Sequence, residues 1–388
     1  MPPEIWKLKP SGWARKGYPD VPATILGSGS GVERKSGAGY VRYEDLYSSN
    51  DSDLQVTLNK VQNLDKMTFP EGEFIIPPSF SKGFKDGIRV GNGGATNCNG
   101  ISGSGKNTVF KMLTSTATQP NYAEFEANNF FLMQANGENW PGGRRPGMEF
   151  SQFTLEGTQL GADHDHNGLR FDSCLNLLVE DVWVTGIKGS NKIPPGETGS
   201  ISLFRNTGGT IRRVDLDGRR NGTRVSAALL MPNNGSNLTV EDSYFHHTRY
   251  GGGGIAWYVY DGGVVRNCRS HYIGTGSGIF AGYSFNHEQA NNIVYYNPDM
   301  ISDRNTTGGT GHMSINSDSA RGGVDNTLTV YNPKWDATGV GGGRFYAEIW
   351  NLGANQVQRK PPTVYGPDGV TLLQYFLVDP YNGSRVIN

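Results

Sequence analysis

A degenerate repeat through the middle of the chain limits the possible folds more than any other feature. A short apolar strand closes each unit, and a second strand, usually preceded by Gly, opens it. The residues that end the closing strands are about 25–35 positions apart. They are Asp181, Arg213, Asp242, Asn267, Asn297 and Asn332. Self-similarity at this period indicates a stacked architecture, in which no repeat buries its apolar face alone.

The composition of the strands indicates the kind of stack. They are short, β-branched or aromatic, and bounded by Gly, Asn and Asp, and the repeats lack a helical period. Helical solenoids and leucine-rich repeats are therefore disfavoured, and propeller blades are too long for these steps. We predict an all-β fold, a right-handed single-stranded parallel β-helix. In-register stacking should place four valines inside it: Val179, Val240, Val265 and Val330.

The Asp and Asn residues that close the strands have two interpretations. They lie where strands turn, and these residue types tolerate left-handed backbone and hydrogen-bond to nearby main chain. The same column of carboxylates and amides could instead serve catalysis. The turn interpretation is favoured because this turn chemistry is common.

Composition and charge exclude several classes of partner. Gly supplies 55 of 388 residues and charged residues only 18%, which fits a chain with many turns. The net charge of -1 offers no basic surface for nucleic acid. No apolar stretch is long enough to span a membrane. Three cysteines, Cys98, Cys174 and Cys268, give no disulfide framework, and no cofactor is expected.

The chain divides into four expected parts. Residues 1–50 are rich in Gly, Ser, Pro and Lys with scattered aromatic residues, as in an extended arm that docks on a partner or stays solvated. Residues 51–66 have an amphipathic pattern, which predicts a helix that caps the open end. Residues 67–350 hold the β-helix, and residues 351–388 break the period as a C-terminal cap or tail. The N-terminus lacks the apolar region of a secretory signal.

Two segments resemble a known family. An apolar strand, Pro70-Glu71-Gly72 and a second apolar strand span residues 67–77, and a similar coil follows at 103–110. Both resemble the opening coils of pectate-lyase-like right-handed β-helices, an opening shared with tail spike and minor tail proteins of tailed bacteriophages. The resemblance covers roughly residues 65–350 as a coil pattern, and it implies a fold without transferring an activity.

The resemblance also supplies a test for enzyme activity. Polygalacturonase-like members use Asn-Thr-Asp, Asp-Asp, Gly-His-Gly and Arg-Ile-Lys in chain order, and pectate-lyase members use Trp-x-Asp-His with acidic calcium ligands. None of these signatures is present in the sequence. Their absence disfavours an enzyme, although paired carboxylates from different coils can also hydrolyse glycosides. The candidates for such a pair are Glu180, Asp215, Asp217 and Glu241.

Two polar loops invite a ligand-binding interpretation. Gly100–Asn107 nearly spells a phosphate-binding loop, but Asn107 replaces the magnesium-binding Ser or Thr and no helix pattern follows. A second loop contains Asp163, His164, Asp165 and His166, which predict either a transition-metal or acid–base site or an ordinary polar turn. A fourth ligand is unassigned, so the turn is favoured and no metal is expected.

The region from Trp183 to Tyr283 is unusually aromatic and includes His246 and His271. Rings at matching positions of successive coils would form a ladder with a spacing of about 4.8 Å, and their apolar faces and polar edges suit a glycan. A subunit interface is the alternative, because Tyr, Trp and Arg are enriched there too. We predict that glycan or receptor contacts centre on these residues: Tyr244, His247, Tyr250, Trp257, Tyr260, Asp261, Arg266 and Tyr272.

These features predict a structural and host-attachment component of a bacteriophage tail, located in the virion and assembled in the host cytoplasm. Its expected partners are further copies in a homotrimer, other tail proteins through the arm, and a host cell-surface glycan. The trimer follows from the resemblance and from the surplus of aromatic residues. A polysaccharide lyase or glycoside hydrolase on the same fold is the first alternative, and a non-viral extracellular surface protein is the second.

Overall fold

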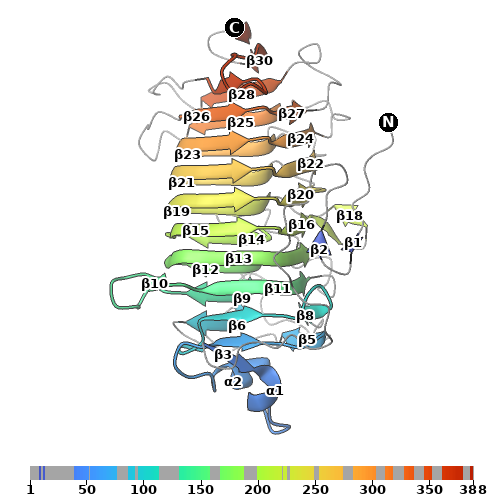
Figure 1. The fold of residues 1–388 in the computed structure, drawn as a ribbon, viewed down its shortest axis with the longest axis vertical. Coiled ribbons are helices and arrows are strands. Elements are labelled where there is room, and N and C mark those ends of the chain that lie inside the picture. The colour runs from blue at the N-terminus through green and yellow to red at the C-terminus, as the bar shows by residue number, and fades with distance from the viewer. Residues whose placement is uncertain are drawn as a thin grey trace, which may run out of the picture. The chain divides into compact units, whose positions relative to one another are not determined.

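The fold is a right-handed parallel β-helix, seen in a computed structural model of the chain (Figure 1). The prediction of the fold class is confirmed. The structure describes residues 8–9, 12–13, 39–51, 53–76, 86–91, 95–112, 131–157, 167–187, 199–220, 222–224, 228–248, 253–273, 283–302, 311–317, 327–335, 345–351, 361–378 and 385–387.

Successive coils stack their strands in parallel register, and the ladder has three faces, here called the first, second and third sheets in the order in which each coil visits them. The first sheet contains β6 (Asp86–Gly91), β9 (Phe131–Asn136), β12 (Asn167–Asp172), β14 (Ile201–Phe204), β25 (Gly311–Ser317), β28 (Tyr346–Asn351) and β30 (Tyr375–Val378). The second contains β3 (Tyr40–Arg42), β4 (Lys66–Thr68), β7 (Gly100–Ser102), β10 (Arg145–Pro146), β15 (Thr207–Arg212), β26 (Leu328–Tyr331) and β29 (Thr363–Tyr365). The third contains β5 (Gly72–Ile76), β8 (Thr108–Met112), β16 (Asp215–Asp217), β20 (Tyr244–His246), β22 (Arg269–Ile273), β24 (Asp299–Ser302) and β27 (Lys334–Trp335).

Longer strands cross from one sheet into the next. Two strands run from the second sheet into the third: β11 (Glu149–Glu156) and β13 (Cys174–Thr185). Three strands run from the first sheet into the second: β19 (Ala228–Glu241), β21 (Gly253–Arg266) and β23 (Tyr283–Tyr296). Because side chains alternate along a strand, each sheet has one face toward the core and one toward solvent.

In-register apolar columns form the interior. In the second sheet one column consists of Met67, Ile101, Phe150, Val179, Ile211, Val240, Val265, Tyr295, Val330 and Val364, and every member is buried. All four valines predicted to stack inside are fully buried, so the alignment of the repeats is confirmed. A column is continuous because each coil presents the same position of its strand to the core.

The strand-closing residues adopt the left-handed backbone that the turn interpretation predicts. Their φ values are 52° at Asp181, 51° at Arg213 and Asp242, 52° at Asn267 and Asn297, and 48° at Asn332. Amide side chains also bond from coil to coil: Nδ2 of Asn297 donates to Oδ1 of Asn267 at 2.9 Å, and Nδ2 of Asn332 donates to Oδ1 of Asn297 at 2.8 Å. The column is therefore a structural ladder along one corner of the helix.

Short elements occupy the two ends of the stack (Figure 1). At the N-terminal end lie α1 (Tyr43–Leu46) and α2 (Leu54–Leu58), and Leu54 and Leu58 of α2 are buried. The helix predicted over 51–66 is only five residues long there: it ends at Leu58, and the backbone is left-handed further on, at Asn63 and Leu64. At the other end β31 (Arg385–Ile387) pairs antiparallel with β30.

Paired strands extend beyond the expected limits of the β-helix, 67 and 350. Before residue 67, β3 pairs in parallel with β4, and beyond residue 350, β29 continues the second sheet. Residues 1–38 form a separate unit, in which β1 (Leu8–Lys9) and β2 (Gly12–Trp13) pair antiparallel. Two further short strands, β17 (Arg219–Arg220) and β18 (Thr223–Arg224), form an antiparallel pair after β16.

Candidate functional site

The outer face of the third sheet gathers polar and aromatic side chains from successive coils. Register pairs Asp215 with Tyr244 and Arg269, and it pairs Asp217 with His246 and His271. The residues between them, such as Leu216 and Phe245, point into the core, so these columns face outward. The name histidine face is used below for nine residues: Asp215, Asp217, Tyr244, His246, His247, Arg269, His271, Tyr272 and Asp299.

His246 lies between two carboxylates of the preceding coil. Its Nε2 is 2.8 Å from Oδ1 of Asp215, and its Nδ1 is 3.7 Å from Oδ1 of Asp217. The imidazole is nearly covered, with 7% of its side chain exposed. An ionised carboxylate only accepts hydrogen bonds, so Nε2 of His246 carries a hydrogen and donates to Asp215.

Arg219 holds Asp217 in its ionised form. From β17, its Nη2 donates to Oδ2 of Asp217 at 2.6 Å and its Nε donates to Oδ1 at 2.9 Å. Burial alone would raise the pKa of Asp217, but the bonds from Arg219 and the nearby His246 outweigh burial, and the pKa lies below its ordinary value. The carboxylate therefore carries a negative charge at neutral pH.

His247 directly follows β20, and Tyr272 lies in β22 at the irregularity between His271 and Ile273. Both have left-handed backbone, with φ of 62° at His247 and 56° at Tyr272. Gly186 is at the position that matches His247 two coils earlier, and it has φ of 75°. A side chain in this conformation costs about 1–2 kcal/mol per residue. The two rings stack with centroids 4.9 Å apart and planes at 21°, which compensates part of that strain.

The next coil adds a second His–Asp pair. Nε2 of His271 lies 3.3 Å from Oδ1 of Asp299, and Nε of Arg269 lies 3.7 Å from Oδ2 of the same carboxylate. The ring of Tyr244 stacks on that of His246 at 4.2 Å and meets His271 edge-on at 5.4 Å. Burial raises the pKa of Tyr244 to about 12, so its hydroxyl stays protonated at neutral pH.

The arrangement offers two kinds of chemistry. Aromatic rings, carboxylates and guanidinium groups alternate at the spacing of the coils, about 4.8 Å, and this mixture can bind the hydroxyls and apolar faces of sugars. An imidazole oriented by a carboxylate, as His246 is by Asp215, can also transfer protons. Three ligand atoms, from Asp217, His246 and His247, further lie close enough together to hold a metal ion.

The structure brings together five of the residues that the sequence singled out. Asp215, Asp217, Tyr244, His247 and Tyr272 all belong to the histidine face. Asp215 and Asp217 were expected as carboxylate candidates and the other three as ligand-contact candidates, so two separate hypotheses converge on one surface.

The prediction that Trp257 and Tyr260 are exposed contact residues is wrong. Trp257 is 0% exposed and Tyr260 is 1% exposed. Nε1 of Trp257 donates to the hydroxyl of Tyr295 at 2.9 Å, inside the coil. The aromatic ladder therefore loses its expected centre, because these two rings fill the core where β21 runs from the first sheet into the second.

Two predicted polar contacts lie away from the histidine face. Asp261 is exposed and accepts a hydrogen bond from Nδ2 of Asn292 at 2.8 Å. Arg266 is exposed on the second sheet, with its guanidinium 5.6 Å from the ring centroid of Tyr296. Tyr250 lies outside the described residues.

The remaining carboxylate candidates, Glu180 and Glu241, also lie on the second sheet. Register places Arg212 between them, and Nε of Arg212 is 3.0 Å from Oε1 of Glu180. They do not share a surface with Asp215 and Asp217, so the structure divides the four candidates into two separate groups.

The two polar loops have different outcomes. Asp163, His164, Asp165 and His166 lie outside the described residues, so this metal hypothesis stays a prediction. Gly100–Asn107 consists of β7 and the connection that follows it, and it leads into β8, a strand rather than a helix. At Gly100 a β-carbon would collide with the backbone carbonyl of Glu149 in the next coil, which explains this glycine by close packing.

Sequence reasoning placed His246 and His271 in the aromatic region without assigning them to a site, and it did not select Arg219 or Asp299. Strand alternation combined with coil register would have found the histidines, because Asp217, His246 and His271 share one outward column. It also missed a stacked tyrosine ladder on the second sheet. Tyr296, Tyr331 and Tyr365 stack with centroids 5.1 and 5.0 Å apart.

No family model matches the chain, and no curated protein sequence matches it. Among solved structures, ORF18 of Geobacillus virus E2 is similar over 87% of this chain and 61% of its own, with 11% identity and a TM-score of 0.49. The tailspike gp61 of Pseudomonas phage phi297 is similar over 80% of this chain and 67% of its own, with 10% identity and a TM-score of 0.42. An alginate lyase of Paenibacillus sp. str. FPU-7 is similar over 84% and 97%, with 12% identity and a TM-score of 0.42.

These similarities concern the β-helix fold. This chain spans about three fifths of the length of the Geobacillus virus protein. Within the described ranges, none of the helices has both the length and the apolar character needed to cross a membrane.

Proposed function

We propose that this protein is a glycan-binding component of a bacteriophage tail, and that it holds an extended host-surface polysaccharide along the histidine face. One observation carries the proposal: outward columns of β16, β20, β22 and β24 present Tyr and His rings beside Asp and Arg in consecutive coils. A sugar chain parallel to the helix axis would meet similar groups at each step of about 4.8 Å.

A binding experiment tests this proposal. The full-length chain would be titrated with capsular and cell-wall polysaccharides of candidate hosts, alongside the variant Tyr272→Gly and the control Tyr331→Ala. Tyr272 is 38% exposed in a turn where glycine is tolerated, and Tyr331 belongs to the stacked ladder on another sheet. We expect affinity to fall about tenfold for Tyr272→Gly and to be retained by Tyr331→Ala. Equal affinities of both variants and wild type would contradict the proposal.

A polysaccharide-cleaving enzyme is the second candidate function. The observation that favours it is the hydrogen bond between Asp215 and His246, which orients an imidazole beside Asp217 and the protonated hydroxyl of Tyr244. Incubation with a polysaccharide that binds, followed by detection of new reducing ends or unsaturated sugars, tests cleavage. His246→Gln would abolish product formation by an enzyme, and a protein that only binds would give no product with either form.

The tail setting and the oligomeric state remain part of the proposal. The aromatic residues of the arm, 1–50, would dock on another virion protein, and the β-helices would associate as a homotrimer. Mass spectrometry of purified virions would detect the chain if it is a tail component. Light scattering of the full-length chain should give the mass of three copies, and a single monomer species at micromolar concentration would rule the trimer out.

A further inference from the structure

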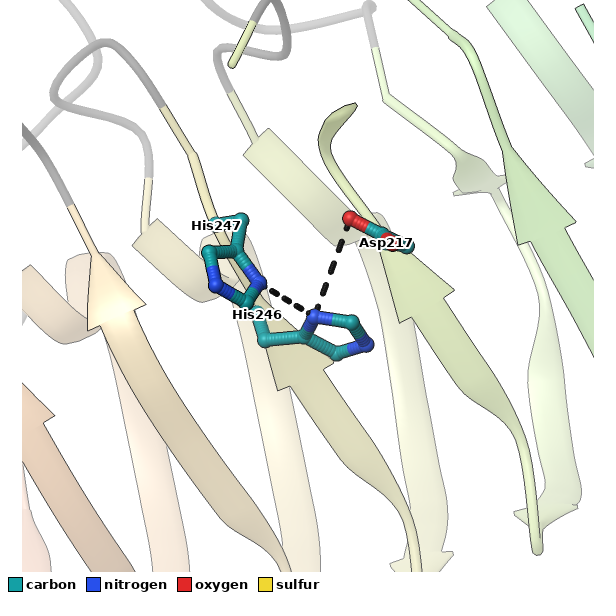
Figure 2. A group of neighbouring side chains, drawn as sticks. All are labelled: Asp217, His246 and His247. Carbon is teal, nitrogen blue, oxygen red and sulfur yellow. Dashed lines mark hydrogen bonds and ion pairs between the residues drawn. The ribbon is translucent and has the colours of Figure 1, made fainter. Parts of the chain in front are cut away.

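We infer that Asp217, His246 and His247 form a binding site for a divalent transition-metal ion of the zinc class (Figure 2). Asp217 ends β16, His246 ends β20 in register with it, and His247 is the next residue. One ligand atom from each lies within 4.8 Å of the others. In Figure 2 the two rings and the carboxylate converge from neighbouring coils.

The hydrogen-bond pattern prepares Nδ1 of His246 as a ligand. Asp215 accepts from Nε2 of that ring at 2.8 Å, which fixes the tautomer and leaves the lone pair of a neutral imidazole on Nδ1. A carboxylate behind a metal-binding histidine is a recurrent outer-sphere arrangement, because it orients the ring and raises its basicity. Here Nδ1 faces the other two members of the site, His247 and Asp217.

The two imidazoles are joined by a hydrogen bond at the position that the ion would take. Nδ1 of His246 and Nδ1 of His247 are 2.6 Å apart, and because Nδ1 of His246 carries the lone pair, Nδ1 of His247 donates to it. A tetrahedral ion with metal–nitrogen bonds of about 2.0–2.1 Å holds two such nitrogens about 3.3 Å apart. Binding would therefore separate the rings by less than about 1 Å, while the hydrogen on His247 moves from Nδ1 to Nε2 and the ion takes its place.

Packing fixes His247 in the position that the site needs. Its ring stacks on Tyr272 at 4.9 Å and meets the ring of His246 at 77°. The backbone at His247 is left-handed, a conformation that Gly186 adopts at the matching position two coils earlier. The chain thus has a histidine at a position whose left-handed backbone favours glycine. This histidine adds a third ligand to Asp217 and His246, which coil register brings together.

The donor set selects the class of ion. Two imidazole nitrogens and one carboxylate oxygen suit Zn²⁺, Co²⁺ or Ni²⁺, whereas Ca²⁺ and Mg²⁺ prefer sites built from oxygen ligands. Asp215 and Asp217 bring two negative charges against the single positive charge of Arg219, so a cation is favoured although Arg219 already binds Asp217. The described residues provide three ligands, which leaves a fourth position for water or for an oxygen of a bound molecule.

Metal titration of the full-length chain tests the site. After treatment with a chelator, the protein would be titrated with Zn²⁺ by calorimetry and with Co²⁺ by visible absorption. We expect one equivalent of each to bind per chain, with Co²⁺ bands of a four-coordinate nitrogen and oxygen site. His247→Gly, which suits the left-handed turn, and Asp217→Asn should each weaken binding at least about tenfold, since even outer partners of metal ligands have effects of this size.

His271→Gln is the matched control, because His271 is a histidine of the same column with its own carboxylate, Asp299. It should bind Zn²⁺ as the wild type does. The absence of stoichiometric Zn²⁺ binding by the wild type would overturn the site. So would equal affinities of wild type, His247→Gly and Asp217→Asn, with cooperative unfolding of each variant confirming that it is folded.

Discussion

Residues 244–296 contain two aromatic regions that face opposite sides of the same coils. Inside, Trp257 donates to the hydroxyl of Tyr295, and Nε2 of the buried His287 lies 2.6 Å from that hydroxyl. Outside, the rings of Tyr244 and Tyr272 stack on His246 and His247 among carboxylates and guanidinium groups. The residue types are nearly the same, and only their direction from the strand separates a core from a candidate binding surface.

The difference shows how each environment satisfies polar atoms. Nδ1 of His287 lies 2.8 Å from the carbonyl oxygen of Ser314, so that nitrogen donates and Nε2 accepts from Tyr295. The interior network is neutral and closed, as a buried network must be. The exterior network contains ionised Asp217 and Arg219 and is open to a ligand at His247 and Tyr272.

Truncating the interior should have the largest effect on stability. Trp257→Ala removes a fully buried ring and the donor to Tyr295, so we expect the free energy of unfolding to fall by about 3–5 kcal/mol. Denaturant unfolding measures this loss. An unchanged midpoint would place Trp257 outside the core and remove the distinction between the two regions.

Lowering the pH should have the second largest effect on the stability of the interior. Burial lowers the pKa of His287 to about 4, while an unfolded histidine titrates near 6.5, so the unfolded chain takes up the proton first. The stabilising effect of the neutral ring is present above about pH 6.5 and is lost as the pH falls toward 4. We expect this group to contribute a loss of about 2–3 kcal/mol between about pH 7.5 and pH 4.5.

Unfolding at both pH values, for wild type and His287→Gln, isolates that contribution. The variant should be less stable at neutral pH but should lose less stability on acidification, since it has no ring to protonate. Identical pH dependence of the two proteins would show that His287 is not buried in its neutral form.

Substitutions in the ladder of strand-closing residues should have a smaller effect on stability. Asn297 has φ of 52° and takes part in amide bonds with Asn267 and Asn332. Alanine tolerates left-handed backbone less well than asparagine does, and Asn297→Ala also removes both amide bonds. The free energy of unfolding should therefore fall by about 1–2 kcal/mol. Asn297→Gly keeps the backbone conformation accessible, so it should be more stable than the alanine variant in the same unfolding assay. The reverse order would contradict the turn interpretation.

A substitution on the histidine face should have the smallest effect on stability. Tyr272→Gly relieves left-handed strain while it removes the stack on His247, so these effects oppose each other and stability should change by less than about 1 kcal/mol. Thermal unfolding measures the change, and the glycan titration described above measures the function of the same variant. A loss of several kcal/mol would make Tyr272 part of the core rather than of a binding surface.

Much of the fold could be predicted because its signals are local. Apolar strands closed by Asn or Asp identify both the buried column at Val240 and Val265 and the left-handed corner at Asn267 and Asn297. Both follow from alternation along one strand and from the turn chemistry of one residue. The helix predicted near the N-terminal end is longer than the five residues observed, because amphipathic spacing does not reveal where a helix ends.

The sequence by itself determined the stack of coils, its strand-closing turns and the high content of aromatic residues in the coils from residue 244 onward. Only the tertiary structure decided that Trp257 fills the core while His246 faces Asp215, Asp217 and His247 outside it. The physical reason is that the contacts of Trp257 with Tyr295, and of His246 with Asp215 and Asp217, join residues of different coils and so depend on coil register. Loops of variable length set that register, and no local pattern of side chains specifies which strand positions they align.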